Sequence, residues 1–345
     1  MEKIKVAIVG AGNIAQNAHL PAYQKRDDIE ITAIVDLNLE RAQQAAEKFG
    51  IPKAFASIEE MLANAECDYV DICVWNRSHS SCAIAAARAG KHILCEKPMA
   101  LNLEHALEMK KEVEKAGVLV MLAVPTRYSA EAQLLREMVD AGKLGDIYYA
   151  KTAYIRRRGT PVGWFTDTTK SGGGPVIDIG VHCIDRTWFL MGNPKPVRVS
   201  ASTSYAIGDF KTRGVDRWVA LDSDVTAFDT EDSAAGVVHF ENGACMMFEV
   251  SWALNAPGES YTQICGSKAG ARLDPLTIYG EEMGYLTDNQ PTTESKDIFS
   301  AEIEHFLDCL RNGKKPISDL DQAVTMQRIL QGIYDSARLG KEVEI

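Results

Sequence analysis

The sequence predicts an α/β protein in two parts: a doubly wound parallel sheet, followed by an α+β domain with a large, open and mostly antiparallel sheet. Up to about residue 122, short β-branched runs alternate with amphipathic helical runs, which is typical of a parallel sheet covered on both faces. From about Gly145, strand-like segments follow one another with few helices between them, which favours antiparallel pairing. We therefore expect domains at residues 1–123 and 124–345, since 345 residues exceed one typical core.

The first half divides into strands and helices that alternate along the chain. Glycines follow several of the expected helices, notably Gly50, Gly90 and Gly117, where a left-handed residue ends a helix. The strands are expected at 5–9, 30–35, 69–74, 92–95 and 118–122, and the helices at 14–26, 39–49, 58–65, 80–89 and 103–116.

The second half contains mainly strands and closes with two helices. Asn242-Gly243 predicts a tight hairpin turn between two of the strands. The strands are expected at 147–155, 197–205, 233–241, 244–252 and 261–265, and the helices at 298–312 and 320–339.

Composition and charge exclude several classes of protein. A net charge of -11 argues against a polyanionic partner such as nucleic acid; the short Arg156-Arg157-Arg158 run is better explained as a solvated or substrate-facing strand end. The eight cysteines form no C-x-x-C pair and several lie in apolar runs, as expected for reduced, buried thiols. With no signal peptide and no long apolar stretch, we expect a soluble, cytoplasmic protein without a membrane partner.

A glycine-rich turn follows the first expected strand and opens the first expected helix. Gly10 and Gly12 are spaced to allow a tight turn and the close approach of a pyrophosphate. Ala15 takes the place of the third glycine, a permitted variant. The run predicts a Rossmann domain whose candidate cofactor-binding residues here are Gly10, Gly12, Asn13, Ile14 and Ala15.

Asp36 ends the second expected strand, where a carboxylate accepts hydrogen bonds from the adenosine ribose hydroxyls. A 2'-phosphate there would meet a like charge, so NAD is favoured over NADP. Arg41 lies near enough in the sequence to leave NADP possible.

Glu96-Lys97-Pro98 ends the strand expected at 92–95, at the sheet edge where open α/β proteins bind ligands. Pro98 restricts Lys97 to an extended backbone, which favours a fixed, aimed ammonium group. A surface lysine before a loop is the alternative.

Asp178 and His182 stand four residues apart after the run Gly172-Gly173-Gly174. If Asp178 opens a helix, the two side chains share one face, where a carboxylate can orient a general base. His182 on an apolar helix face is also compatible with a core histidine, and Asp178 with a helix N-cap. A metal site is not expected, because no third ligand clusters with them.

Taken in order, Gly10-x-Gly12-x-x-Ala15, Glu96-Lys97-Pro98 and the glycine run with Asp178-x-Gly180-x-His182 resemble the glucose-fructose oxidoreductase and inositol dehydrogenase family, Gfo/Idh/MocA. The resemblance spans nearly the whole chain. It implies NAD(P)-dependent oxidation or reduction of a sugar or polyol carbon. By this similarity the catalytic residues are Lys97, Asp178 and His182, and the residues flanking the cofactor are Trp75, Asn76, His79 and Glu96.

The resemblance suggests a sugar or cyclitol dehydrogenase in which His182 is the general acid/base and Lys97 polarises the reacting oxygen. Alternatives are a non-catalytic dinucleotide-sensing regulator, or a reductase of imines, bile pigments or trans-diols on the same fold. The open sheet predicts a homodimer or homotetramer through the C-terminal domain. Candidate substrate-binding residues besides the catalytic three are Arg127, Tyr128, Arg158 and Trp164, with Asp167 a weaker candidate.

Overall fold

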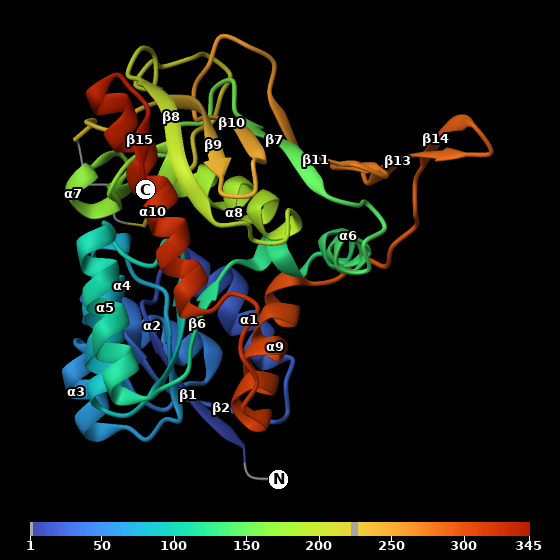
Figure 1. Ribbon diagram of the computed structural model, residues 1–345. Helices are drawn as coiled ribbons and strands as arrows, with labels where there is room; N and C mark the ends of the chain where they lie inside the picture. The colour runs from blue at the N-terminus through green and yellow to red at the C-terminus, as the bar shows by residue number, and fades with distance from the viewer. Residues whose placement is uncertain (1–2, 222–226) are drawn as a thin grey trace. The chain divides into compact units, whose positions relative to one another are not determined.

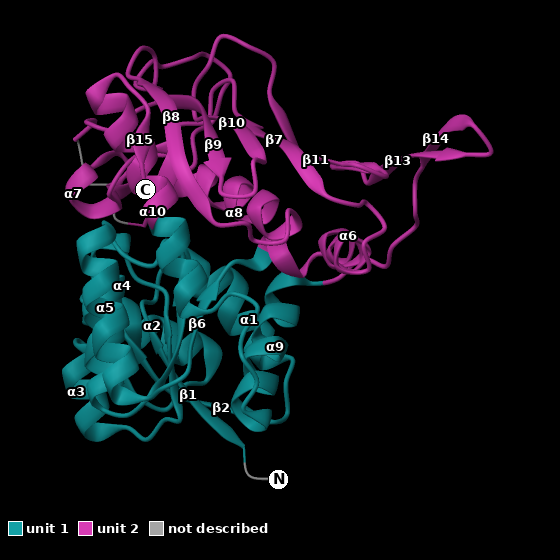
Figure 2. Cartoon of the chain, in the orientation of Figure 1, with its two compact units in different colours: residues 1–125, 297–327 teal, residues 126–296, 328–345 magenta. Residues whose placement is uncertain are grey.

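The computed structural model describes residues 3–221 and 227–345. The chain divides into two compact units, the first made of residues 1–125 and 297–327 and the second of residues 126–296 and 328–345 (Figure 2).

The first unit contains a six-stranded sheet in the order β3-β2-β1-β4-β5-β6. Every neighbouring pair in it is parallel, as predicted for a Rossmann domain. The two-residue β3 is additional to the predicted strands. The strands are β1 (Ile4–Val9), β2 (Ile29–Val35), β3 (Ala54–Phe55), β4 (Tyr69–Ile72), β5 (His92–Glu96) and β6 (Val120–Ala123).

Helices cover both faces of this sheet because alternate strand residues point to opposite sides. Ala7 and Val9 of β1 belong to a core with α3, α4 and α5, whereas Val6 and Ile8 belong to a core with α1, α2 and α9 (Figure 1). The helices are η1, a π-helix (Ala15–His19), α1 (Leu20–Gln24), α2 (Leu39–Phe49), α3 (Ile58–Asn64), α4 (Asn76–Arg88), α5 (Leu103–Ala116) and α9 (Ile298–Asn312).

The first unit is not one continuous stretch of sequence, in contrast to the expected division at residues 123 and 124. Helix α9 returns to it because Ile303, Phe306 and Leu307 are buried in the same core as Leu20 and Tyr23 of α1. The following helix, α10 (Leu320–Leu339), belongs to the first unit up to Gln327 and to the second from Arg328.

The second unit contains a nine-stranded sheet in the order β14-β13-β12-β11-β7-β10-β9-β8-β15. Only the central pair β7–β10 is parallel among the described pairings, so the predicted mostly antiparallel sheet is confirmed. The strands are β7 (Ile147–Ile155), β8 (Pro196–Ser204), β9 (Ser233–Phe240), β10 (Cys245–Ser251), β11 (Glu259–Gly266), β12 (Gly270–Leu273), β13 (Thr277–Glu282), β14 (Tyr285–Asn289) and β15 (Val343–Glu344).

The last four strands in chain order, β12 to β15, are additional to the predicted ones. The hairpin β13–β14 extends away from the rest of the second unit (Figure 1), and its side chains are largely exposed. The Asn242-Gly243 turn is confirmed between β9 and β10, where Gly243 adopts φ of 85°.

Helical segments of the second unit are short, and several are absent from the predicted set. The predicted helix at Asp178 is present but begins two residues earlier, as a π-helix that continues into an α-helix. The segments are η2 (Pro125–Tyr128), α6 (Ala130–Asp140), η3 (Trp164–Thr166), α7 (Thr168–Ser171), η4, the π-helix (Val176–Gly180), and α8 (Val181–Leu190).

Two further observations concern the hydropathy of the helices and the state of the cysteines. Within the described ranges, no helix combines the length and hydropathy that crossing a bilayer requires. All eight cysteines lie in described residues and are free thiols.

Candidate active site

The turn after β1 has the backbone geometry that a dinucleotide phosphate requires. Gly10 has φ of 106°, and a Cβ atom there would lie 2.4 Å from the carbonyl oxygen of Cys73, so no other residue fits. A Cβ atom on Gly12, in contrast, would meet nothing within 4 Å. Gly12, Asn13 and Ile14 are partly exposed at the start of the helical run, whereas Ala15 is buried. The open space beside Gly12 at a helix N-terminus fits the pyrophosphate of a dinucleotide.

Asp36 follows β2 and is held in place by the turn and by one arginine. One carboxylate oxygen accepts the Ala11 N–H at 2.9 Å, and the other accepts the Asn38 N–H at 2.9 Å. Arg41 binds both oxygens, with Nε at 3.0 Å and Nη2 at 2.7 Å. The carboxylate predicted to bind the ribose hydroxyls is therefore paired with the arginine that the sequence analysis left as a partner for a 2'-phosphate.

The end of the loop after β4 and the first turn of α4 contain the three residues expected to flank the cofactor. Trp75 is the N-cap of α4 and is partly exposed, while Asn76 and His79 are buried. His79 bridges two backbone segments, since Nδ1 lies 2.6 Å from the Pro98 carbonyl oxygen and Nε2 lies 3.0 Å from that of Val74. The structure therefore shows a positioning contact for His79, and its contact with the cofactor stays a prediction.

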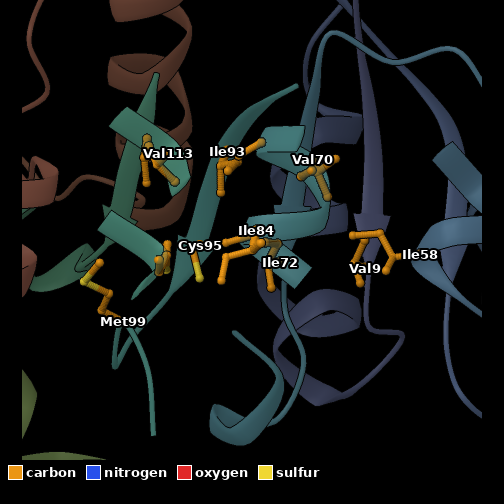
Figure 3. Packing of buried hydrophobic residues seen from close by; sticks show 14 of the residues in the cluster. Val9, Ile58, Val70, Ile72, Ile84, Ile93, Cys95, Met99 and Val113 are labelled. Atoms are coloured by element: carbon orange, nitrogen blue, oxygen red, sulfur yellow. The ribbon is translucent and has the colours of Figure 1, made fainter. Parts of the chain in front are cut away.

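Lys97 stands at the carboxyl end of β5, between residues that are fully buried. Glu96 accepts the Lys97 N–H through Oε2 at 3.1 Å. Cys95 and Met99, on either side in the sequence, anchor the segment in one of the two cores of the first unit (Figure 3). The Lys97 side chain itself is only partly buried. A fixed backbone with a partly exposed side chain fits the aimed ammonium that the sequence predicts.

The glycine run before η4 is required because the Glu231 backbone and the Tyr334 side chain occupy the space beside it. A Cβ atom on Gly174 would lie 2.2 Å from the carbonyl oxygen of Glu231, and one on Gly173 would lie 2.0 Å from the Tyr334 hydroxyl. The Glu231 carboxyl accepts the Gly174 N–H at 2.9 Å, the Val176 N–H at 3.2 Å and the Tyr334 hydroxyl at 2.8 Å. Burial raises the pKa of Glu231. This carboxyl fixes the start of the helix that bears the candidate acid/base residues.

Asp178 and His182 are both partly exposed on a helical segment whose other residues, from Val176 to Asp185, are buried. Asp178 is not the helix N-cap, because the cap is Pro175. Its Oδ2 atom accepts the indole N–H of Trp252 at 2.9 Å. Both side chains are partly exposed on one helical segment of the second unit, and their joint action as carboxylate and general base stays a prediction. Lys97 belongs to the first unit, so its convergence with this pair remains a prediction.

The other predicted substrate residues differ in how available they are. Arg127 is 1% exposed and forms a two-pronged ion pair with Asp185, at 2.7 and 2.6 Å. Tyr128 is also buried. Asp167 is the N-cap of α7 and accepts the Thr169 N–H at 3.0 Å. These three are therefore better explained by structural roles.

Arg158 and Trp164 remain partly exposed in the second unit. The guanidinium of Arg158 donates to the Asn255 side chain at 2.7 Å. Trp164 stacks on Phe165 with a centroid distance of 4.0 Å, and Phe165 in turn meets the half-exposed Trp218 edge-on. An aromatic surface of this kind suits the apolar face of a sugar ring.

Several residues of the site were not among the predicted ones. Trp252 donates a hydrogen bond to Asp178, and Glu231 accepts N–H groups at the start of its helix. Both residues are distant in the sequence, so no local pattern reveals these contacts. His19 and Asp71 form buried hydrogen bonds with each other and, through His19, with Glu96. The signal for Asp71 was in the sequence, since it interrupts the apolar strand Tyr69–Ile72.

The parallel sheet, the open Gly12 turn and the Asp36 carboxylate together define a dinucleotide-binding oxidoreductase. Residues 4–124 match the family model described as an oxidoreductase family with an NAD-binding Rossmann fold, and residues 136–345 match the C-terminal alpha/beta domain of that family. The chain belongs to the Gfo/Idh/MocA oxidoreductase family.

Relatives of known activity and solved structures extend this comparison. The chain is 35% identical over 348 residues to D-glucoside 3-dehydrogenase of Escherichia coli, covering 99% of this chain and 97% of that protein. It is 27% identical to trans-1,2-dihydrobenzene-1,2-diol dehydrogenase of Mus musculus, covering 95% of each. The fold is similar to that of a levoglucosan dehydrogenase in complex with NADH and L-sorbose, with a TM-score of 0.86, 22% identity and coverage of 100% and 99%.

Proposed function

We propose that the protein transfers a hydride between a nicotinamide cofactor and a secondary alcohol or ketone carbon of a sugar or cyclitol. The observation that carries this proposal is the accessible pair Asp178 and His182 on an otherwise buried helical segment, in a chain whose first unit presents an open dinucleotide turn. The D-glucoside 3-dehydrogenase relative supports a sugar substrate and favours a glucoside with a free ring hydroxyl.

In the oxidative direction, the His182 imidazole accepts the hydroxyl proton of the substrate. The ammonium of Lys97 donates a hydrogen bond to the reacting oxygen and stabilises the negative charge that develops there. Asp178, steadied by the Trp252 N–H, orients the imidazole or a substrate hydroxyl. A nicotinamide cofactor held by the Gly12 turn and Asp36 would supply the acceptor for the hydride of the carbon that bears this oxygen, so that the alcohol would become a ketone and one proton would remain on the protein. Reduction uses the same groups in reverse.

NAD is the proposed cofactor, with NADP possible. The Asp36 carboxylate presents acceptors for the ribose hydroxyls, and a 2'-phosphate would be repelled by it. Arg41 is bound to both oxygens of that carboxylate, so it would have to leave Asp36 in order to pair with a phosphate.

Sugar binding is proposed for Arg158, for Trp164 and for the catalytic three. The stack of Trp164 on Phe165 gives a flat apolar surface, and Arg158 adds hydrogen-bond donors. Arg127 and Tyr128 are not included, because their side chains are buried and Arg127 is committed to Asp185.

We also propose a homodimer or homotetramer through the open face of the nine-stranded sheet. Thr152 of β7 points toward α8, where its hydroxyl lies 3.5 Å from the Cys183 carbonyl oxygen. Side chains alternate between the two faces along a strand, so Met247 of β10 points to the face opposite that of Thr152. It is 41% exposed. Light scattering should show more than one chain per particle, and Met247→Asp should reduce the mass. A wild-type particle of 37.8 kDa would contradict this proposal.

A cytoplasmic location is proposed from the eight free thiols, which suit a reducing compartment.

The decisive test is a substrate panel of glucosides, free hexoses and cyclitols, each with NAD and with NADP, followed by absorbance at 340 nm. Turnover that disappears in Lys97→Met and His182→Asn, while NADH binding persists in both, would support the proposal. A wild-type protein that binds NADH tightly yet oxidises no member of the panel, and reduces no corresponding ketone, would contradict it and favour a dinucleotide sensor.

A trans-diol substrate is the second candidate, since a dihydrodiol dehydrogenase is among the relatives. It requires the same hydride transfer from a ring carbon that bears a hydroxyl. Including trans-dihydrodiols in the panel separates the two, because activity on them alone would exclude a sugar as substrate.

A further inference from the structure

A group of polar side chains is buried in the first unit, and the proposed hydride transfer does not use it. Its members come from η1, α1, β4, the turn after β4, and β5. None is more than 7% exposed. The group is His19, Tyr23, Asp71, Cys73 and Glu96.

His19 lies between two carboxylates. Its Nδ1 atom is 2.8 Å from Asp71 Oδ2, and its Nε2 atom is 3.1 Å from Glu96 Oε1. Ionised carboxylates only accept hydrogen bonds, so both ring nitrogens must carry a proton and the ring must be an imidazolium. Burial alone would lower the pKa of His19, but the charge of Asp71 and its hydrogen bond raise the pKa well above the ordinary value.

Three of these atoms also have the character of metal ligands. The ligand atoms of His19, Asp71 and Cys73 lie within 4.8 Å of one another. The Cys73 thiol, however, lies 3.5 Å from Asp71 as a hydrogen-bond donor, and Asp71 also accepts from Tyr23 and contacts His19. Side chains that already satisfy one another in this way are better explained as an ion and hydrogen-bond network than as a metal site.

The network reaches the candidate catalytic lysine through Glu96. One oxygen of Glu96 faces His19, and the other accepts the backbone N–H of Lys97 at 3.1 Å. On the far side of Lys97, the Pro98 carbonyl oxygen contacts His79 Nδ1 at 2.6 Å. The backbone that carries the Lys97 amine is thus held from both sides by buried histidines, and on one side this hold passes through a single carboxylate.

We propose that His19 is a positioning residue for Lys97: its imidazolium fixes the Glu96 carboxylate, which in turn fixes the backbone of Lys97. The proposal rests on the proposed function only in giving Lys97 a catalytic task. Without His19, the carboxylates of Asp71 and Glu96 face each other without a buried cation, so Glu96 must rotate or take up a proton, and its hold on the Lys97 N–H changes.

Two amide substitutions separate this role from a merely structural one. The amide nitrogen of His19→Gln can occupy the place of Nε2 and keep a donor toward Glu96, whereas that of His19→Asn can occupy the place of Nδ1 and keep a donor toward Asp71. Each variant loses the positive charge and one of the two hydrogen bonds. Tyr23→Phe is the matched control, because it removes the 2.9 Å hydrogen bond to Asp71 and leaves the contact between His19 and Glu96 in place.

We expect all three variants to unfold at lower temperature than the wild type. His19→Asn should lower kcat by about 10- to 100-fold, since small misplacements far from the chemistry can have effects of that size, with little change in the KM for NAD. His19→Gln should restore most of that kcat, and Tyr23→Phe should leave it unchanged. Equal kcat in His19→Asn and His19→Gln, or losses that follow thermal stability across the set, would overturn the proposal.

A second readout does not depend on catalysis. Trace acetylation of the cofactor-free protein, followed by peptide mass spectrometry, gives the reactivity of Lys97 relative to the exposed Lys143. The ratio should change several-fold in His19→Asn and remain near wild type in His19→Gln and Tyr23→Phe. An unchanged ratio in His19→Asn would overturn the proposal even in a protein that oxidises no sugar, so its failure is distinguishable from failure of the proposed function.

If His19→Asn does not fold, Glu96→Gln provides the test by the same two readouts. It keeps the size of the side chain and removes the charge that His19 holds. A Lys97 reactivity ratio equal to that of the wild type would then count against the proposal.

Discussion

Two buried glutamates do similar work in the two units but in opposite electrostatic settings. Glu96 accepts the N–H of Lys97, and Glu231 accepts the N–H groups of Gly174 and Val176 before the helix of Asp178 and His182. Burial disfavours the charge on both. The hydrogen bond and charge of His19 nevertheless lower the pKa of Glu96, whereas Glu231, held by backbone N–H groups and a tyrosine hydroxyl, has a raised pKa.

This difference indicates which substitutions should disturb the candidate catalytic residues of each unit. The first unit fixes its candidate catalytic residue with a buried ion network, so changes of charge should disturb it most. The second unit fixes its pair with hydrogen bonds and close packing around glycines, so changes of volume should disturb it most. Substitutions in the two units therefore test this contrast, and those in the proposed chemistry should have the largest effect.

Removing the proposed base should have the largest effect. His182→Asn should lower kcat by roughly 10² to 10⁴-fold, because a positioned general base contributes about that much. NADH affinity, measured by fluorescence titration, should stay within error of the wild type. Retention of full turnover would remove His182 from the mechanism.

Neutralising the two glutamates should have unequal effects on stability. Glu96→Gln breaks a buried charge pair and should lower the free energy of unfolding by about 3 to 5 kcal/mol. Glu231→Gln keeps one acceptor but turns an NH2 group toward a backbone N–H, so it should lower the free energy of unfolding by about 1 to 3 kcal/mol. Urea denaturation at pH 7.5, followed by tryptophan fluorescence, measures both. A larger loss in Glu231→Gln would reverse the contrast between the units.

Adding one methyl group to a glycine should show the opposite ranking. In Gly174→Ala the new Cβ would lie 2.2 Å from the Glu231 carbonyl oxygen, and such overpacking costs typically about 1 to 3 kcal/mol. In Gly12→Ala the methyl group enters open space, so unfolding should change little while NADH binding weakens. Equal melting temperatures for the two variants would contradict this reading of the glycines.

The Asp36–Arg41 pair should set cofactor preference by a smaller amount. Asp36→Ala removes the repulsion toward a 2'-phosphate and releases Arg41, so kcat/KM for NADP relative to NAD should rise by roughly 10-fold, about 1.4 kcal/mol. The double variant Asp36→Ala with Arg41→Ala should lose most of that gain. An unchanged ratio in the single variant would show that other residues select the cofactor.

The buried imidazolium should give a modest pH dependence of stability. His19 has a raised pKa in the folded state, so its stabilising contribution is complete below the ordinary value of about 6.5 and is lost as pH rises through the raised pKa. Asp71, Cys73, Glu96, Glu302 and Tyr23 are the titratable groups around it. Melting temperature of the wild type minus that of His19→Gln should therefore decrease from pH 6.5 upward; a constant difference would mean that the ring does not titrate there.

Local patterns predicted most of the regular structure. The helices Leu39–Phe49, Leu103–Ala116, Ile298–Asn312 and Leu320–Leu339 have the predicted bounds, because amphipathic spacing is a short-range property and a glycine at left-handed φ follows each of the four. The hairpin β13–β14 escaped prediction because β14 and the end of β13 are largely exposed and lack the alternation of apolar residues that reveals a strand.

The motifs that carry the candidate chemistry could be recognised in the sequence, but the residues that hold them in place could not. Gly10, Gly12, Asp36, Lys97, Asp178 and His182 stand in recognisable local patterns. Arg127 was predicted to bind the sugar, but its guanidinium forms a buried ion pair with Asp185, 58 positions away in the sequence.

The sequence by itself determined the two sheets, the dinucleotide turn and the family, because periodicity, turn residues and motif spacing are properties of neighbouring positions. Only the tertiary structure decided that α9 belongs to the first unit, that Glu231 and Tyr334 make the glycine run obligatory, and that His19 reaches Glu96 across 77 positions. These contacts depend on burial, because a buried charge needs a polar partner and a tightly packed position must leave room for its neighbours. Both the partner and the neighbours come from segments that are distant in the sequence.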